Sequence, residues 1–439
     1  MDQIEFERVA ASFAAFHQEF APLFGRTEAR QRSEQYLRGL LVQQTDRRNA
    51  ENLAEIIPGA TPRSLQRFLT ESSWDDEAVI DRLQRYVGQR LPQAEGVWVL
   101  DDTGFAKQGK KSVGVARQYS GTLGKVGNCQ VGVFLAYVSA QGHALVDKAL
   151  YLPQAWTSDR QRCREAGVPA DLGYQTKAEL GLGLLRRARQ AGHLRAQWVT
   201  ADAGYGEVPT LRDALDAEGW RYILEVPCTT HVFTHAAQVA VPAWSGRGRQ
   251  PTQPQLVAGE PGAQSVAAVA ASLPAADWHT LTVAEGAQGP RIHQFAALVV
   301  WESRDGLPGR ASWLVLRRHL AERGSEAKYY LSNAPADTPL LRLAQVGAMR
   351  WPIESEFQSD KSETGLDEYE VRTWLGWHHH ITMALLAGAF LLSLQLDWGE
   401  KDAPGHSAPD HPCAPATVAA AHLDTARVVG LAHPDPGSQ

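Results

Sequence analysis

Two short apolar segments, each followed at once by aspartate, constrain the fold of this chain more than any other feature. The first, Val97–Leu100, leads into Asp101 and Asp102, and the second, Gln197–Thr200, leads through one alanine into Asp202. Apolar runs of this length are typical of strands that are buried on both faces of an α/β sheet. Carboxylates at the carboxyl ends of such strands lie where open α/β sheets bind their ligands. The sequence therefore predicts an α/β core with an acidic site.

The hydrophobic pattern changes several times along the chain and predicts five segments. Residues 1–92 show apolar residues at helical spacing and are expected to form a helical module. Residues 93–227 alternate strands and helices, which predicts the first part of a mixed sheet flanked by helices. Residues 228–335 combine a stretch rich in Pro, Gly and Ala with short strand-like runs, so we expect an inserted β unit. Residues 336–397 are predicted to be helical, and residues 398–439 to be a mobile tail.

Composition excludes several classes of protein. The chain has 439 residues, of which 44% are hydrophobic and 21% are charged, as in globular proteins. Its four cysteines lie far apart without a CxxC pair, which argues against a zinc ribbon or a disulfide scaffold and fits a reducing cytoplasm. The run Met383–Leu396 is too short to span a bilayer, so we expect a buried helix and no membrane partner. The net charge of −6 argues mildly against a nucleic-acid partner.

A third charged element lies near the C-terminal end of the chain. Pro352 suits the first turn of a helix, and helical spacing then places Arg350, Glu354 and Lys361 on one face. A solvated face of ion pairs would show the same spacing. Phe357 belongs to an adjoining apolar stripe, which instead favours partial burial of Glu354.

Three carboxylates from two strands and one helix would form a site for hard divalent cations. We expect Asp101, Asp202 and Glu354 to be the ligands, with Asp102 as the substitute for Asp101. Mg²⁺ prefers oxygen ligands, and two such ions support phosphoryl transfer. The alternative is that each aspartate merely caps a turn. In the metal interpretation, the nearby cations of the helix would contact substrate phosphates.

The local charge distribution favours a phosphate-bearing substrate. Between Thr103 and Val146 there is no Asp or Glu, although this stretch holds several cations and glycines. A basic hairpin beside the first aspartate would help to hold a polyanion, whereas an ordinary solvated hairpin would look similar. The expected DNA contacts in this stretch are Lys107, Lys110, Lys111, Arg117 and Lys125.

Taken together, these motifs resemble those of bacterial insertion-sequence transposases, which have an RNase-H-like DDE core with a β-strand insertion. The resemblance covers roughly residues 95–395, and its most specific part places an arginine four residues before a glutamate and a lysine seven residues after it, as at Arg350, Glu354 and Lys361. The family's Asp-x-Thr motif favours Asp101 over Asp102. The family usually has a tyrosine three residues before the arginine, where this chain has Gly347.

The resemblance implies a mechanism and its partners. Asp101, Asp202 and Glu354 would hold two Mg²⁺ ions, with Mn²⁺ as a substitute. Water would cut a phosphodiester at the ends of the element, and the 3′-hydroxyl released would attack target DNA, with Arg350 and Lys361 steadying the phosphates. The N-terminal module would help to recognise terminal repeats, and the insertion would help to cover the active site and flanking DNA. A homodimer would act on paired ends of double-stranded DNA, in the cytoplasm and associated with the nucleoid.

Other functions remain open alternatives. A metal-dependent nuclease with the same core would cut DNA without joining it, and a domesticated DNA-binding protein would have lost catalysis. A two-carboxylate glycoside hydrolase fits less well, because the basic stretch and the spacing of Arg350 and Lys361 do not suit a neutral sugar.

Overall fold

The computed structural model describes residues 3–42, 47–121, 124–286, 289–319 and 327–399; within these ranges the side chains of residues 285, 286, 289, 354, 355, 358, 359, 398 and 399 are not described. The chain divides into two compact units, which are described separately: residues 1–196 with 351–439, and residues 197–350. The predicted mobile tail lies outside the described residues from position 400 onward.

The N-terminal helices of the first unit follow local capping signals. Thr61 and Ser64 form a capping box, Pro62 occupies the first turn, and Asn49 and Asp75 each accept hydrogen bonds from the turn that follows them. These signals start three of the α-helices that the structure describes in the predicted module, which is helical as expected. The helices are α1 (Gln3–Phe20), α2 (Thr27–Leu40), α3 (Ala50–Ile56), α4 (Pro62–Thr70) and α5 (Asp76–Arg90).

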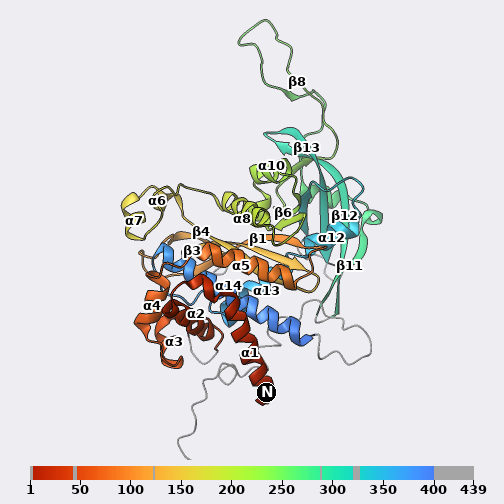
Figure 1. The fold of residues 1–439 in the computed structure, drawn as a ribbon. Coiled ribbons are helices and arrows are strands. Elements are labelled where there is room, and N and C mark those ends of the chain that lie inside the picture. The colour runs from red at the N-terminus through yellow and green to blue at the C-terminus, as the bar shows by residue number, and fades with distance from the viewer. Residues whose placement is uncertain (1–2, 43–46, 122–123, 287–288, 320–326, 400–439) are drawn as a thin grey trace, which may run out of the picture. The chain divides into compact units, whose positions relative to one another are not determined.

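These helices share their core with a helix from the other end of the chain, α14 (Trp374–Gly399), which lies beside them in Figure 1. The Phe16 and Phe390 rings are 5.4 Å apart, and the Trp74 and His379 rings stack at 3.7 Å. By length and composition α14 could cross a membrane, but 83% of its most apolar window is buried inside the structure. The expected buried helix is therefore present, and it is longer than the apolar run that predicted it.

The sheet of the first unit is an antiparallel set around β3 (Lys125–Ser139), which pairs with β1 (Val97–Ala106), β2 (Ala116–Ser120) and β4 (Gly142–Tyr151). Two short helices, α6 (Gln154–Thr157) and α7 (Arg160–Glu165), lead to α8 (Lys177–Ala191), which packs against β3 and β4. The sequence patterns did not reveal β4, because Asp147 and Lys148 interrupt its apolar pattern. Both are buried, paired with Arg187 and Asp76 respectively.

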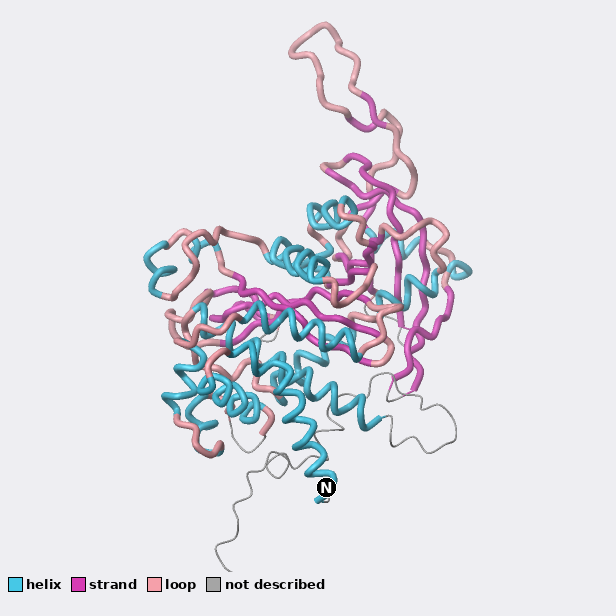
Figure 2. Tube along the Cα trace, viewed as in Figure 1, coloured by secondary structure: helices cyan, strands magenta, loops and turns pink. Residues whose placement is uncertain are grey.

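The second unit contains a mixed sheet flanked by helices. β5 (Trp198–Ala201) runs parallel to β6 (Arg221–Val226), and β6 continues into antiparallel strands in the order β14, β13, β12, β7 and β10. These strands are β7 (His231–Phe233), β10 (Gln264–Ser265), β11 (His279–Gly286), β12 (Gly289–Arg304), β13 (Leu307–His319) and β14 (Lys328–Ser332), with β8 (Val239–Ala240) and β9 (Gln255–Leu256) forming a separate pair. The helices are α9 (Ala203–Gly206), α10 (Pro209–Ala217), α11 (Val266–Ser272) and α12 (Leu340–Ala348). Figure 2 shows the strand-rich character of this part, and the α/β class with an inserted β unit is confirmed.

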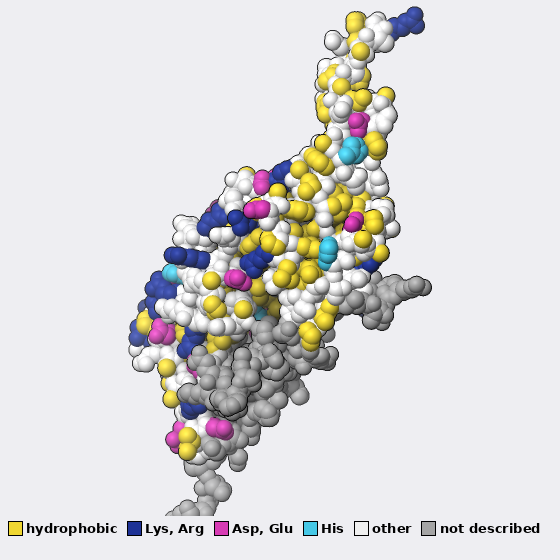
Figure 3. Space-filling model, turned by 90° about the vertical axis from the view of Figure 1, so that its right-hand side faces the viewer, with side chains coloured by type: hydrophobic (Ala, Val, Ile, Leu, Met, Phe, Trp, Pro, Cys, Tyr) yellow, Lys and Arg dark blue, Asp and Glu magenta, His cyan; other side chains and the backbone are white. Residues whose placement is uncertain are grey.

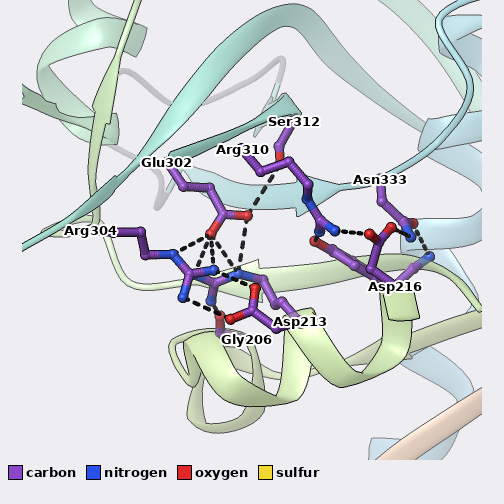
Figure 4. Close-up of polar contacts among 10 residues, drawn as sticks. Gly206, Asp213, Asp216, Glu302, Arg304, Arg310, Ser312 and Asn333 are labelled. Atoms are coloured by element: carbon purple, nitrogen blue, oxygen red, sulfur yellow. Dashed lines mark hydrogen bonds and ion pairs between the residues drawn. The ribbon is translucent and has the colours of Figure 1, made fainter. Parts of the chain in front are cut away.

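A buried ionic network joins α10 to the inserted strands (Figure 4). Glu302 of β12 is 2% exposed and accepts hydrogen bonds from Arg212, at 2.8 Å, and from Ser312 of β13, at 3.1 Å. Arg304 adds a second cation and connects Glu302 to Asp213 at the surface. Burial opposes ionisation of Glu302, but hydrogen bonds and charge from the two arginines keep its pKa below the ordinary value.

We predict that Glu302→Gln lowers the free energy of unfolding by about 3 kcal/mol at neutral pH, because it leaves Arg212 buried without its counter-charge. Urea denaturation followed by tryptophan fluorescence measures this. The difference between wild type and variant should shrink as the pH falls below the ordinary carboxyl range, because a lowered pKa means that the stability from ionised Glu302 is lost on acidification. Asp213→Asn is the matched control, since Asp213 is 59% exposed and its loss should cost less than about 1 kcal/mol. Equal effects of the two substitutions would contradict the importance of burial.

Candidate active site

The first predicted aspartates lie within a strand rather than at its end. β1 continues to Ala106, and Asp101 and Asp102 pair across the ladder with Phe134 and Val133 of β3. The expected end of the strand at Leu100 is therefore wrong. The strand continues because Thr103, Gly104 and Phe105 are also buried, so their backbone groups need ladder partners.

The two aspartates face opposite sides of β1, as strand alternation requires. Asp102 accepts a hydrogen bond at 2.9 Å from Lys177, in the first turn of α8. Thr103, on the same face as Asp101, accepts one at 2.7 Å from Lys361 of α13 (Trp351–Glu363). Phe134, directly opposite Asp101, meets the ring of Phe357 of α13 at 5.3 Å. The helix that carries Glu354 therefore covers the Asp101 face of β1.

Lys361 links α13 to β1 at the predicted site. Its ammonium group also lies 3.5 Å from the carbonyl oxygen of Gly104 and 5.8 Å from the centre of the Phe105 ring. Burial lowers the pKa of Lys361, with Asp367 nearby acting in the opposite sense. Glu354 lies in α13, three residues before Phe357 and seven before Lys361. Its side chain is not among those that the structure describes.

The other side of α13 is fixed by acidic residues to which the sequence patterns assigned no role. Glu356 pairs with His143 of β4 at 2.8 Å, and Asp360 is buried. Burial, together with the charges of Glu356 and Glu363, raises the pKa of Asp360 well above its ordinary value. A Cβ on Gly388 of α14 would lie 3.0 Å from the Asp360 carboxyl, so the two helices approach closely there. The spacing of Glu356, Asp360 and Glu363 by four and three residues was a signal for this second stripe.

Asp202 lies where the sequence predicted it, directly after the buried strand β5. It is the N-cap of α9 and accepts a hydrogen bond at 3.3 Å from the backbone amide of Tyr205. Gly206 ends this short helix against β6, where an added Cβ would lie 1.8 Å from the carbonyl oxygen of Glu225. The turn that carries Asp202 is therefore held tightly against the sheet.

The inserted strands brace the same turn. Arg212 donates a hydrogen bond to the carbonyl oxygen of Gly206, and it is also the arginine that pairs with buried Glu302 of β12 (Figure 4). A chain of contacts thus runs from the insertion through α10 to α9, whose first turn Asp202 caps. This gives the insertion a role in positioning Asp202.

Arg350 precedes α13 and is only 8% exposed. Its guanidinium lies 3.5 Å from Glu225 of β6, and Glu225 also accepts a hydrogen bond at 2.8 Å from Lys328. Gly347, where the resembling family has tyrosine, lies in α12, and a Cβ there would make ordinary contacts with Ile223 and Tyr330. The DNA contact predicted for Arg350 stays a prediction.

The predicted basic stretch comprises the end of β1, a loop, and the paired strands β2 and β3. Ser120 of β2 lies so close to Gly104 that a Cβ on this glycine would be 2.2 Å from the Ser120 hydroxyl. Lys107 is half-buried: its ammonium donates to the carbonyl oxygen of Tyr369 at 2.9 Å and lies over that ring, and burial lowers its pKa to about 8. The other four predicted contacts are exposed: Lys110, Lys111, Arg117 and Lys125.

A cavity of about 710 Å³ lies elsewhere in the first unit, between α5, β4 and α8. None of the predicted site residues lines it, and its walls hold Asp75, Asp76, Glu77, Asp81, Asp147 and Asp171. The lining also holds Lys148 and Arg187, and because no predicted site residue lies there, this cavity is not the candidate site.

Asp101 and Glu354 belong to the first unit and Asp202 to the second, so their meeting in one metal site stays a prediction. Among the side chains that the structure describes, which exclude that of Glu354, no group of three or more His, Cys, Asp or Glu residues could hold a metal ion. The predicted donors are all carboxylate oxygens, the set that hard cations such as Mg²⁺ prefer, so the residues fit the ion chemically.

We predict that Gly206→Ala displaces α9 and lowers the free energy of unfolding by roughly 1–3 kcal/mol, because its Cβ overlaps the Glu225 carbonyl oxygen. Chemical denaturation gives the stability, and amide exchange at Ala203–Gly206 reports the local displacement. Gly183→Ala in α8 is the control, since its Cβ meets nothing within 4 Å and alanine favours helix. A fully tolerated Gly206→Ala would show that α9 is not held as tightly as we infer.

Comparison with known proteins bears on the family of this chain. The family model described as "DDE superfamily endonuclease" matches residues 19–290, more than half of the chain, including Asp101 and Asp202 but not Glu354. A probable transposase for insertion sequence element IS701 from Microchaete diplosiphon is 28% identical over 198 residues, which are 45% of this chain and 49% of that protein. The chain thus spans about half the length of this curated relative.

Among solved structures, a piggyBac transposase synaptic complex with hairpin DNA aligns over 98% of this chain and 84% of its own, with 9% identity. Its TM-score of 0.35 is too low to support an argument about fold or function. The family assignment rests instead on the matched sequence. This chain belongs to the DDE superfamily endonuclease family.

Proposed function

We propose that this protein is an insertion-sequence transposase that hydrolyses phosphodiester bonds at the ends of its element and joins those ends to target DNA. The observation that carries the proposal is the covering of the Asp101 face of β1 by α13, the helix that contains Glu354. Membership of the DDE superfamily endonuclease family and the position of Asp202 after β5 support it.

In this proposal Asp101, Asp202 and Glu354 are the ligands of two Mg²⁺ ions, for which Mn²⁺ can substitute. The bound ions would supply Lewis-acid stabilisation of the charge that develops on the attacking and leaving oxygens. The chain's own contribution is to hold the carboxylates in place. Lys361 and Phe357 fix α13 over β1, and the Arg212–Glu302 pair braces the turn after Asp202.

Asp101 is the better candidate for the first ligand, because Asp102 already pairs with Lys177 on the opposite face of β1. Asp101 accepts a hydrogen bond at 2.7 Å from the backbone amide of Asp102, which orients its carboxylate. A metal ion that bound Asp102 would have to displace the ammonium of Lys177.

Double-stranded DNA is the partner that the charges favour. The acid-free stretch after the first aspartates exposes four cations: Lys110 and Lys111 in the loop after β1, Arg117 in β2 and Lys125 in β3. Such a surface attracts the phosphate backbone. Arg350, Lys361 and Lys107 would contact DNA only if their present partners, Glu225, Thr103 and Tyr369, released them. We further propose a homodimer acting on paired ends, in the cytoplasm at the nucleoid.

We predict that Asp101→Asn and Asp202→Asn each abolish Mg²⁺-dependent cleavage of element-end DNA while the chain stays folded. Loss of a carboxylate ligand removes several kcal/mol of transition-state stabilisation, so cleavage should fall about 1,000-fold or more. Gel analysis of labelled duplexes measures cleavage, and circular dichroism confirms folding.

Asp102→Asn is the matched control, one residue away and on the opposite face. It should retain cleavage within about tenfold of wild type, because its loss removes only a part-exposed ion pair. If Asp102→Asn were inactive and Asp101→Asn active, the ligand would move by one position. If both Asp101→Asn and Asp202→Asn cleaved normally, the site would be elsewhere.

Strand transfer distinguishes a transposase from a nuclease with the same core. We predict that the full chain with Mg²⁺ joins linear DNA bearing 3′-hydroxyl ends of its element to a supercoiled plasmid. The assay detects labelled ends covalently attached to the plasmid, and EDTA should prevent their formation. Cleavage without joining would support the nuclease instead, and DNA binding without cleavage would support an inactive descendant.

A further inference from the structure

An arm of the second unit has the charge and shape of a DNA-reading element. Residues 239–256 leave the body of this unit as a long loop closed at its base by β8 and β9 (Figures 1 and 2). Residues 241–254 are exposed, apart from Pro242 and Pro251, which are partly exposed. Each limb of such a loop can extend roughly 25 Å, so the tip can reach well beyond the inserted strands.

The base of the arm is anchored. Val239 pairs with Leu256 and Ala240 with Gln255, and the amide of Val257 donates to the carbonyl oxygen of Gln238 at 3.0 Å. Below this ladder, His235 and Glu260 pair at 2.8 Å. An anchored base with an exposed tip presents the tip in a restricted set of directions.

The charged side chains of the arm are all positive. No Asp or Glu occurs between Glu225 and Glu260, and the cations of the arm are Arg247 and Arg249, both exposed. Figure 3 shows Lys or Arg side chains at the far tip of the arm. An acid-free loop with arginines at its tip is complementary to a polyanion.

The residues next to Arg247 are glycines. Gly246 and Gly248 flank Arg247, and both adopt positive φ angles, of 82° and 73°. Such angles favour glycine and bend the chain sharply. Trp244 donates a hydrogen bond at 3.3 Å to the carbonyl oxygen of Gly248, which holds the bend together. The tip therefore presents two guanidinium groups, with glycines on both sides of Arg247 and the Trp244 indole at the bend.

These features fit the minor groove of DNA. That groove is about 6 Å wide and is narrowest and most negative in A·T tracts, where inserted arginines bind best. Guanidinium is more weakly hydrated than ammonium, so it enters such a groove at lower cost. The G·C pair adds a 2-amino group to the groove floor and obstructs insertion.

We propose that residues 241–254 form a minor-groove arm that inserts Arg247 and Arg249 into A·T-rich duplex DNA. This rests on the proposed function only in taking DNA as the partner, and it adds a sequence preference that is independent of the catalytic carboxylates. The arm thus biases which duplex the full chain engages.

Binding of the full chain to three matched 30-base-pair duplexes tests the proposal, in EDTA so that no cleavage occurs. The duplexes are A·T-rich, G·C-rich, and the G·C duplex with inosine in place of guanine, which removes the minor-groove amino group but keeps the major-groove pattern. We expect the A·T and inosine duplexes to bind at least about fivefold more tightly than the G·C duplex. The variant with Arg247→Ala and Arg249→Ala should lose this preference, bind the A·T duplex about tenfold more weakly, and show a salt slope smaller by about 2.

Two further variants sharpen the result. Arg247→Lys with Arg249→Lys keeps the charge and should keep G·C binding while losing most of the preference. Gln250→Ala with Gln253→Ala, in the same arm, should change nothing. A preference that persisted in the double alanine variant would overturn the proposal and leave the proposed function intact, as would tight binding to A·T but not to inosine. A wild-type chain that bound no duplex would contradict both, and a change confined to self-association would make the arm a protein contact.

Discussion

A buried charge must find a counter-charge or give up its ionisation, and this requirement organises both units. Asp147 is held by Arg187, Glu302 by Arg212 and Arg304, and Asp76 by Lys148. Burial and neighbouring carboxylates instead raise the pKa of Asp360. The ion-paired acids have their partners within their own units and stabilise the fold of each unit. Asp101 and Asp202 each accept a hydrogen bond from a backbone amide, which helps to orient the carboxylate.

Stabilising contacts of this kind lie next to the candidate ligands. Lys361 ties α13 to Thr103, two residues beyond Asp101, while the Glu356–His143 pair fixes the other side of that helix. In the second unit, Arg212 connects the turn after Asp202 to the inserted strands. The sequence alone assigns the insertion no role in positioning the ligands. Through Arg212, the insertion supports the turn that carries Asp202, one of the proposed ligands. Catalysis by paired metal ions requires such rigidity, because the ligands must not move as charge develops.

Local sequence signals predicted the elements well, and long-range partners poorly. The apolar spacing in residues 1–92 predicted helices, and the apolar run before Asp202 predicted β5. β4 was not predicted, because charged residues such as Asp147 and Lys148 are typical of the surface. Their burial depends on ion pairs with Arg187 and Asp76, which the local sequence does not reveal. The Arg212–Glu302 pair joins residues 90 positions apart, which no local pattern reveals. The apolar stripes of the N-terminal helices did not predict that these helices pack against α14. An apolar stripe indicates that a helix face is buried, but it does not indicate which element covers that face.

We propose that Asp101, Asp202 and Glu354 converge on paired metal ions. Crystals of the full chain grown with Mn²⁺ would show this through the anomalous scattering of the metal. We expect two manganese peaks about 4 Å apart, in contact with all three carboxylates. Manganese bound elsewhere, or carboxyl groups of Asp101 and Asp202 too far apart to share an ion, would contradict it.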